Sequence, residues 1–192
     1  MSSPVSVQKQ YTYKDYKGLP ADKKYEILEG VLHALAPSPS TQHQRVLGNL
    51  FVAVKNQLKE NHCEAFCAPY DVLLPDADED EDTEKIKTVV QPDIMVVCDK
   101  TKLTEKHCVG APDFIIEIVS SSSPSIDYVK KLHLYEKHKV REYWIVNYHR
   151  KDIMVYRLQE DGEYGAPEIY SDGEIASDVL ENVRIALEDI FK

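Results

Sequence analysis

The amino-acid sequence predicts an α/β (α+β) fold, in which a mixed central β-sheet is flanked by helices. The first observation is a strand–helix–strand order: the apolar segment 113–119, a helical segment, and an apolar strand at 142–147. Because a right-handed crossover lays such a helix back onto the sheet, the two strands should be parallel neighbours. The second observation is a hairpin pattern at 25–35, and strands joined by a polar turn at 148–152, which add antiparallel pairs.

The first half of the chain alternates short strands with one long helix. Residues 1–20 carry turn residues and scattered charge, which predicts a loose arm with one short helix near residues 16–24. Apolar residues recur at steps of one, three and four between 41 and 60, which indicates one apolar face of a helix. Short strands are expected at 64–69 and 71–74.

The second half contains most of the strands. Ser123 can cap the helix that follows segment 113–119, Pro124 suits its first turn, and the helix should run to about His138. Further β-type or apolar segments are expected at 88–92, 93–98, 153–158, 163–170 and 183–191.

Length and composition favour one domain, residues 21–192, after the N-terminal arm 1–20. The chain has 192 residues, of which 43% are hydrophobic and 29% charged, as in ordinary globular proteins. The longest apolar runs are about seven residues, against roughly 18 for a membrane span. The first twenty residues lack the apolar core of a secretory signal, so we expect a cytoplasmic protein without membrane attachment.

The acidic charge is concentrated in one segment. The net charge is −10, and the acidic residues between 76 and 84 contribute −7 of it, leaving −3 for the rest of the chain. Such a run usually forms a solvated loop. A calcium loop is disfavoured because Glu81 occupies the turn position that requires glycine, and Lys87 the position of the bidentate glutamate. The acidic total therefore does not exclude a polyanionic partner elsewhere on the surface.

The four cysteines do not form a disulfide framework in a chain of this length. Cys63, Cys67, Cys98 and Cys108 are interpreted as buried thiols in a reducing cytoplasm. Two sets could suggest zinc: His62 with Cys63 and Cys67, and Cys98 with His107 and Cys108. Neither set has the paired CxxC spacing of a zinc site, which makes zinc the less favoured interpretation.

Two carboxylates on apolar strands are the unusual chemical feature. Asp93 opens segment 93–98, and Glu117 lies inside segment 113–119 on the face of Ile115 and Val119. A buried carboxylate is costly unless a cation or several donors satisfy it. Two that converge would suit Mg²⁺ or Mn²⁺, hard ions that keep waters and phosphate oxygens as further ligands. The alternative is an ordinary ion pair at each strand end.

A lysine completes the candidate site. Asp127, Lys131 and Tyr135 recur at a spacing of four and share one helix face. The helix follows directly from the strand that carries Glu117, so Lys131 can project its ammonium toward the end of that strand, where open sheets bind ligands. A surface pair of Asp127 with Lys131 is the alternative.

Several segments together resemble a known family. They are Tyr25–Gly30, His43 at the start of a helix, Gln91-Pro92-Asp93 with the strand after it, Ala111–Ser120, the Asp127/Lys131/Tyr135 series, and Val140–Val146. Their order and spacing are similar to the Uma2 group of restriction endonucleases, within the PD-(D/E)xK nuclease superfamily. The similarity extends over roughly residues 25–191.

The resemblance implies a restriction-endonuclease-like fold and a Mg²⁺- or Mn²⁺-dependent endonuclease, acting on DNA rather than RNA. Asp93, Glu117 and the Ile118 carbonyl would bind the metal. The superfamily's lysine, expected two residues after Glu117, is replaced here by Val119. In the Uma2 group a helix lysine substitutes, which maps to Lys131.

Supporting roles and partners follow from the same resemblance. Glu26 and His43 match further motif positions; Glu26 would extend the acidic cluster, while His43 would contact a phosphate or simply pack. The cations Lys130, Lys137, Lys139 and Arg141 near the site would bind nucleic acid, or form a solvated helix face. A homodimer is compatible with this reading. Two alternatives stay open: an inactive nucleic-acid- or protein-binding module with the nuclease fold, and a self-associating structural protein.

Overall fold

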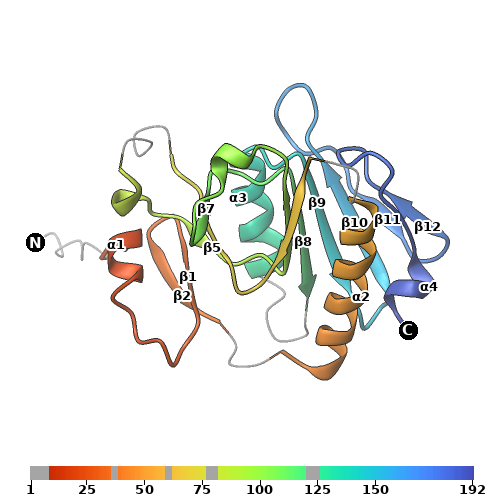
Figure 1. Ribbon diagram of the computed structural model, residues 1–192, viewed down its shortest axis with the longest axis horizontal. Coiled ribbons are helices and arrows are strands. Elements are labelled where there is room, and N and C mark those ends of the chain that lie inside the picture. Colours follow the sequence, from red (N-terminus) through yellow and green to blue (C-terminus); the bar gives the residue numbers. More distant parts are fainter. Residues whose placement is uncertain (1–8, 36–38, 59–61, 77–81, 120–125) are drawn as a thin grey trace, which may run out of the picture.

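The central element of the computed structural model is a six-stranded mixed sheet (Figure 1). The structure describes residues 9–35, 39–58, 62–76, 82–119 and 126–192, the side chains of 126–128 excepted. The strand order is β11-β10-β9-β8-β6-β3, in which β8 and β9 are parallel and the other neighbours antiparallel. The strands are β3 (Glu64–Cys67), β6 (Ile94–Val97), β8 (Phe114–Val119), β9 (Glu142–Asn147), β10 (Asp152–Arg157) and β11 (Glu168–Tyr170).

The predicted strand–helix–strand unit is confirmed. Strand β8 leads through the π-helical segment η3 (Ile126–Lys131) and helix α3 (Leu132–Lys137) into β9, which runs parallel to it. The register pairs Phe114 with Glu142 and Glu117 with Ile145. The expected cap at Ser123-Pro124 lies outside the described residues.

A second, smaller sheet lies beside the first and contains the predicted hairpin. Its order is β2-β1-β5-β4-β7, and the hairpin turns at Glu29 and Gly30, whose φ angles are 49° and 80°. Positive φ at both central positions is typical of the tight turn that matches strand twist, which explains the glycine. The strands are β1 (Tyr25–Leu28), β2 (Val31–Ala34), β4 (Asp71–Leu73), β5 (Val89–Val90) and β7 (His107–Val109).

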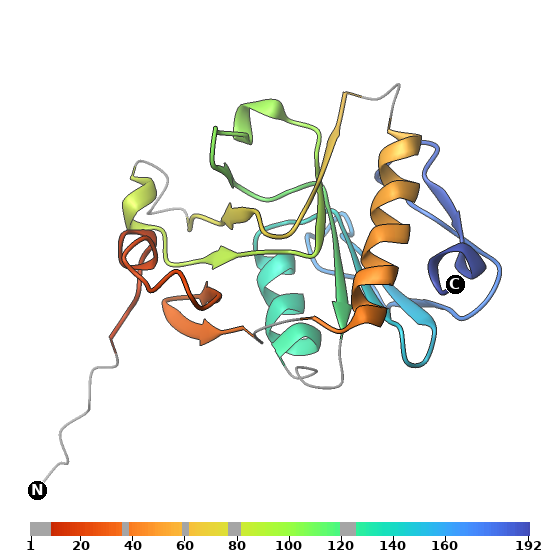
Figure 2. The same cartoon turned by 60° about the horizontal axis from the view of Figure 1, so that its bottom comes forward.

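Strand β8 is covered by helices on both faces, as its apolar sequence predicts. Helix α2 (Thr41–Gln57) packs with Phe114, Ile116 and Ile118, whereas α3 packs on the side of Ile115 and Val119. Figure 2 shows α2 and α3 on opposite sides of β8. Glu117 therefore points toward α3, the face that strand periodicity assigned to it.

The N-terminal segment differs from its prediction. Helix α1 (Tyr13–Tyr16) begins earlier than the helix expected near residues 16–24, and the backbone N–H of Tyr13 donates to the Ile86 carbonyl. Tyr13 is 8% exposed and packs in a small cluster with Ile27, Leu73, Ile86 and Val89. The described part of the arm thus packs on the second sheet, because its tyrosine rings supply apolar area that a short, non-periodic segment does not reveal in sequence.

The C-terminal segment forms a small two-stranded sheet and a short helix. These elements are β12 (Glu174–Ala176), β13 (Arg184–Ala186) and α4 (Leu187–Ile190), so the apolar stretch 183–191 divides into a strand and a helix. Two short 3₁₀ turns, η1 (Thr83–Lys85) and η2 (Lys100–Lys102), complete the described elements. In the described part of the chain, no helix has the length and apolarity to cross a membrane.

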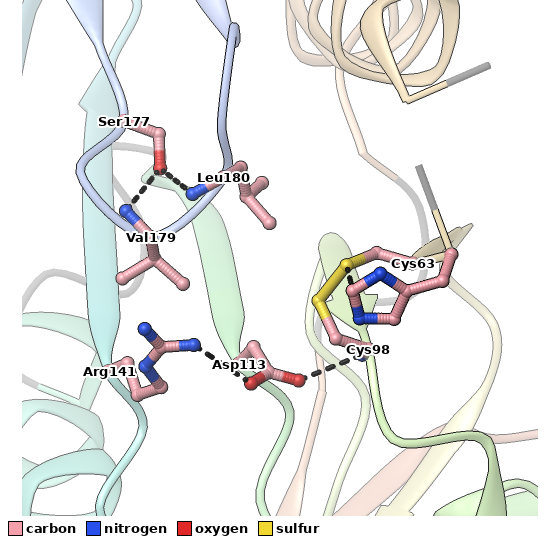
Figure 3. Close-up of a disulfide and its surroundings, with 8 residues drawn as sticks. Cys63, Cys98, Asp113, Arg141, Ser177, Val179 and Leu180 are labelled. Carbon is pink, nitrogen blue, oxygen red and sulfur yellow. Dashed lines mark hydrogen bonds and ion pairs between the residues drawn. A yellow bond between two sulfur atoms is a disulfide. The ribbon is translucent and has the colours of Figure 1, made fainter. Parts of the chain in front are cut away.

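The prediction of four free cysteines is wrong. Cys63 and Cys98 form a disulfide, whereas Cys67 and Cys108 are free thiols (Figure 3). The sheet register explains the pairing: Glu64 lies opposite Val97 in the β3–β6 ladder, which brings the next residues outward, Cys63 and Cys98, face to face. A separation of 35 residues hides this contact in the sequence.

Candidate active site

A buried lysine joins two buried carboxylates. The Lys131 Nζ atom lies 2.8 Å from Glu117 Oε1 and 3.0 Å from Glu26 Oε1. The three residues are 3%, 5% and 1% exposed, respectively, and come from η3, β8 and β1. Since an isolated buried charge is strongly destabilising, the two acids and the ammonium can be buried only together. The structure therefore contains the predicted contact between Lys131 and Glu117.

Tyr135 completes this cluster one helical turn after Lys131. Its hydroxyl donates to Glu117 Oε1 at 2.7 Å. Burial raises the pKa of Tyr135 well above its usual value, and the neighbouring charges of Glu117 and Glu26 add to the shift. The hydroxyl consequently stays protonated and remains a donor. Together with Lys131, it holds one oxygen of Glu117 in a defined position.

Asp93 lies beside Glu117 at the start of β6. The ladder pairs Ile94 with Ile116, and its extension by one residue sets Asp93 opposite Glu117. Asp93 lies one residue before the paired part of β6, so this position concerns its backbone. Asp93 Oδ2 accepts a hydrogen bond from the backbone N–H of Ile118 at 2.8 Å, which fixes its carboxylate next to Glu117.

His43 contacts this same aspartate from the first turn of α2. Ser40 caps the helix by accepting from the His43 backbone N–H at 3.1 Å, and His43 Nε2 lies 3.3 Å from Asp93 Oδ2. The imidazole is 9% exposed and meets the Tyr148 ring edge-on. The sequence suggested two roles for His43, contact with a phosphate or packing. The geometry indicates a third role, in which His43 orients the Asp93 carboxylate.

A polar network that the sequence reasoning missed holds Glu26 in place. The Gln91 backbone N–H donates to Glu26 Oε1 at 2.8 Å. The Gln91 side-chain amide donates to Asp71 Oδ1 at 2.7 Å and to the Tyr16 hydroxyl at 3.1 Å, and Tyr16 donates to Asp71 at 3.0 Å. The one available signal was the position of Gln91 directly before Pro92-Asp93. Helix α1 is thereby connected to the site through side chains.

The donor set fits a hard divalent cation. Glu26 Oε2 is buried without a hydrogen-bond partner among the described residues, an anionic oxygen that a cation or its water could satisfy. Asp93 and Glu117 add carboxylate oxygens from adjacent strands. In the described part of the chain, no three acidic or histidine ligand atoms at this site lie within 4.8 Å of one another. Mg²⁺ is usually held by one or two carboxylates and keeps several waters, so Asp93 and Glu117 could suffice as its protein ligands.

Two predicted site positions need separate comment. Val119 is 2% exposed and packs in the apolar cluster around α3, so the position of the superfamily's lysine is part of the core. The side chain of Asp127 lies outside the described residues, and its predicted supporting role stays a prediction.

A surface pocket of about 640 Å³ lies between the β1–β2 hairpin and the η3–α3 segment, the elements that carry Glu26 and Lys131, although neither of these two side chains lines it. It is lined by His33, which lies opposite Glu26 in the hairpin, and by the exposed Lys130. The predicted basic segment is partly neutralised here: Lys137 pairs with Glu29 at 2.8 Å and with Asp76 at 2.9 Å. Among the described residues, Lys130 is exposed and forms no ion pair.

Comparison with known proteins identifies the class. The structure matches a crystal structure described as "a putative nuclease belonging to DUF820" from Anabaena variabilis, with a TM-score of 0.74, 18% identity, and coverage of 94% of this chain and 97% of that chain. This match shows the restriction-endonuclease-like fold predicted from the sequence.

The particular family follows from the sequence profile. The profile described as "Uma2: Putative restriction endonuclease" matches residues 11–188, so the chain belongs to the Uma2 family. Among curated proteins, none matches this chain.

Proposed function

We propose that this protein is a metal-dependent endonuclease that hydrolyses phosphodiester bonds in DNA. One observation carries the proposal: the Lys131 ammonium lies within hydrogen-bonding distance of Glu117 and Glu26, and Asp93 is fixed beside Glu117. Acids and an amine from four segments of the chain meet at one place, and the exposed Lys130, next to Lys131 in sequence, lines a surface pocket. Membership of a nuclease family agrees with this chemistry.

Asp93, Glu117 and the Ile118 carbonyl would hold the ion, which we propose to be Mg²⁺ or Mn²⁺. When bound, it would polarise a non-bridging phosphate oxygen and acidify a coordinated water. The chain's own contribution is to hold hard oxygen donors in place: Ile118 N–H and His43 orient Asp93, and Tyr135 orients Glu117.

Lys131 would take the role that the superfamily gives to a lysine on the strand. Its ammonium can orient the attacking water and offset negative charge that develops on the phosphate oxygens. For this role the position of the positive charge in space matters, whereas the place in the chain of the lysine that carries it does not. Glu26 helps to hold the ammonium in place, because Lys131 forms ion pairs with two carboxylates, Glu26 from β1 and Glu117 from β8.

Lys130 would contact a phosphate that flanks the scissile one. It adjoins Lys131 in sequence, lines the pocket and is exposed. Each phosphate contact of this kind makes binding depend on salt, because bound counterions are released. Lys130→Ala should therefore lower the slope of log affinity against log salt by about 1. Filter binding over a salt series measures this slope.

The direct test is cleavage of supercoiled plasmid, linear DNA and RNA in Mg²⁺ or Mn²⁺. We expect metal-dependent DNA cleavage that is lost in Asp93→Ala and in Glu117→Ala. Glu168→Ala, which removes an acid that is 58% exposed and far from the cluster in sequence, is the matched control and should keep full activity. Cleavage that survives both site substitutions would contradict the proposal, because a contaminating nuclease would explain it better.

An inactive module that binds nucleic acid or protein is the second candidate. The observation in its favour is Val119, which leaves the usual lysine position apolar. Calorimetric titration with Mn²⁺ separates the two candidates: a module without a metal site gives no heat that depends on Glu117. DNA binding without metal binding or cleavage would favour the module.

The proposal includes a cytoplasmic location and allows a homodimer. Light scattering with and without DNA measures the oligomeric state. In the cytoplasm, glutathione and thioredoxin-type reductants act on disulfides. Such reductants would convert the Cys63–Cys98 disulfide of this structure into two thiols.

A further inference from the structure

Three potential metal ligands gather at the end of β6 opposite to Asp93. The Nε2 or Nδ1 atom of His62 and the Sγ atoms of Cys63 and Cys98 all lie within 4.8 Å of one another. His62 Nε2 and Cys63 Sγ are 3.9 Å apart. Among the described residues, this is the one group of three histidine, cysteine or acidic ligands that is so close.

The sheet determines this geometry. Antiparallel pairing of β3 with β6 sets Cys63 opposite Cys98, and His62 precedes Cys63 in the chain. The Cys98 backbone N–H donates to Asp113 Oδ2 at 2.8 Å, which anchors the β6 side of the pair (Figure 3). Neither grouping considered from sequence contained this set, because its members come from two strands that only the fold brings together.

Access differs among the three side chains in a way that suits a metal site. His62 is exposed, Cys98 is half-buried and Cys63 is buried. A metal at this position would have protein on one side and water on the other. Two sulfurs and one imidazole are soft and borderline ligands, typical of zinc and unlike the oxygen donors of the candidate active site.

Reduction would convert the disulfide into zinc ligands. A dithiol reductant gives two electrons and two protons to the Cys63–Cys98 bond, which becomes two thiols while the reductant becomes a disulfide. Zinc then binds both sulfurs as thiolates, and the two thiol protons are released. Tetrahedral zinc holds its sulfur and nitrogen donors about 3.5 Å apart, close to the 3.9 Å between His62 and Cys63, whereas the two sulfurs must move apart to a similar spacing by side-chain rotation after reduction.

We propose that His62, Cys63 and Cys98 form a zinc site in the reduced protein, with water as fourth ligand, and that the disulfide is the oxidised, metal-free form of this site. Both the disulfide and the zinc site would link the edge strand β3 to β6. Zinc also ties His62, which lies just after the connection that leaves α2. The inference is independent of nuclease activity, because the site shares no residue with the Asp93–Glu117–Lys131 cluster.

Cobalt titration of the reduced protein tests the proposal. The protein is reduced with a dithiol, desalted without oxygen and titrated with Co²⁺, whose thiolate complexes show an intense sulfur-to-metal absorption band. We expect one equivalent of Co²⁺ to produce the band and Zn²⁺ to abolish it. An ion held by Asp93 and Glu117 has only oxygen ligands and gives no such band, so the two sites are distinguishable.

Variants assign the ligands. Cys63→Ser and Cys98→Ser should each weaken or remove the band, and His62→Ala should weaken Co²⁺ binding roughly tenfold or more. The matched controls are the free thiols: Cys67→Ser and Cys108→Ser should keep the band. Burial raises the pKa of the Cys108 thiol to about 11, which makes it a poor ligand.

The unmodified protein supplies a second measurement that does not depend on whether a variant folds. The oxidised form should show no band, and reduction should make it appear. Absence of the band in the reduced protein, its presence in the oxidised protein, or its full retention in Cys98→Ser would each overturn the assignment.

Discussion

Two buried glutamates on neighbouring strands, Glu117 on β8 and Glu142 on β9, are stabilised in opposite ways. Glu142 is 0% exposed, and Trp144 Nε1 donates to its Oε1 at 2.6 Å. Its Oε2 accepts from the Ser177 hydroxyl and the backbone N–H groups of Asp178 and Val179, at 3.2, 2.9 and 3.2 Å. Glu142 is thus surrounded by donors that are part of the fold.

Glu117 depends on a cation that it shares. Lys131 bonds Glu117 and Glu26 together, and Glu26 Oε2 is buried without a hydrogen bond among the described residues. Glu142 also lies 3.8 Å from Arg157 Nε, but four neutral donors already occupy its two oxygens, and they fasten β9 to the C-terminal segment. Acids that share one ammonium keep anionic capacity for a further cation. The comparison separates an acid with a structural role from the one that we propose to bind a metal, although both are buried to a similar degree.

Isosteric substitution of the two glutamates should give opposite results, with the largest effect at Glu117. Glu117→Gln removes an anionic metal ligand, so DNA cleavage should fall about 10³-fold, or about 4 kcal/mol of activation free energy. Glu142→Gln should leave the cleavage rate within about twofold, because Glu142 is not in the cluster. Single-turnover cleavage measures both rates. Equal losses in the two variants would remove the distinction.

Truncation of Glu142 should affect stability instead. Glu142→Ala leaves the Trp144 indole and the donors around residue 178 without their acceptor, and buried unsatisfied donors cost about 1–3 kcal/mol each. Because donors in one network do not add fully, we expect the free energy of unfolding to fall by about 3 kcal/mol. Urea denaturation measures it, with Glu160→Ala, at an exposed position outside this network, as the control at below about 1 kcal/mol. A loss as small as that of the control would show that the network is dispensable.

Removal of the shared cation is the third test. Lys131→Met leaves Glu26 and Glu117 without their ammonium, so cleavage should fall about 10²-fold, or about 2.7 kcal/mol. The loss of a neighbouring positive charge raises carboxyl pKa values. The remaining activity should therefore require a higher pH than that of the unmodified protein. The measurement is a pH–rate profile, with Lys130→Met as control; an unshifted profile would argue against the coupling.

The smallest effect is expected at Tyr135. Tyr135→Phe removes one neutral donor from Glu117 and keeps the ring, which packs edge-on against Tyr143. One such bond contributes about 1 kcal/mol, so both the cleavage rate and the stability should change modestly, with the rate about fivefold lower. A rate unchanged within error, at unchanged stability, would show that Lys131 positions Glu117 alone.

Much of the site could be predicted because it follows from local patterns. The strand that carries Glu117 leads directly into the helix that carries Lys131, and crossover handedness returns that helix to the sheet. The Asp93 position follows from the start of an adjacent strand. Gln91, Asp71 and Tyr16 were missed because each is an ordinary polar residue in a loop or short element, and their contact depends on how the second sheet packs.

The environment of Glu142 also could not be predicted from the sequence. Glu142 opens a predicted strand, and its sequence neighbours give no reason to expect full burial. Its donors at 177–179 lie in a turn of the C-terminal segment, some 35 residues later, as the Ser177 bond shows. Only the packing of that turn against β9 creates the acceptor's environment.

The sequence itself determined the order of strands and helices and the buried faces of β8 and α2. It also determined which residues are chemically capable, because periodicity and charge act over a few neighbouring residues. The tertiary structure decided which of those residues meet. Long-range strand pairing joined Cys63 to Cys98, the second sheet brought Glu26 to Lys131, and the C-terminal turn enclosed Glu142. Such contacts depend on the register and packing of segments far apart in the chain, which no local pattern encodes.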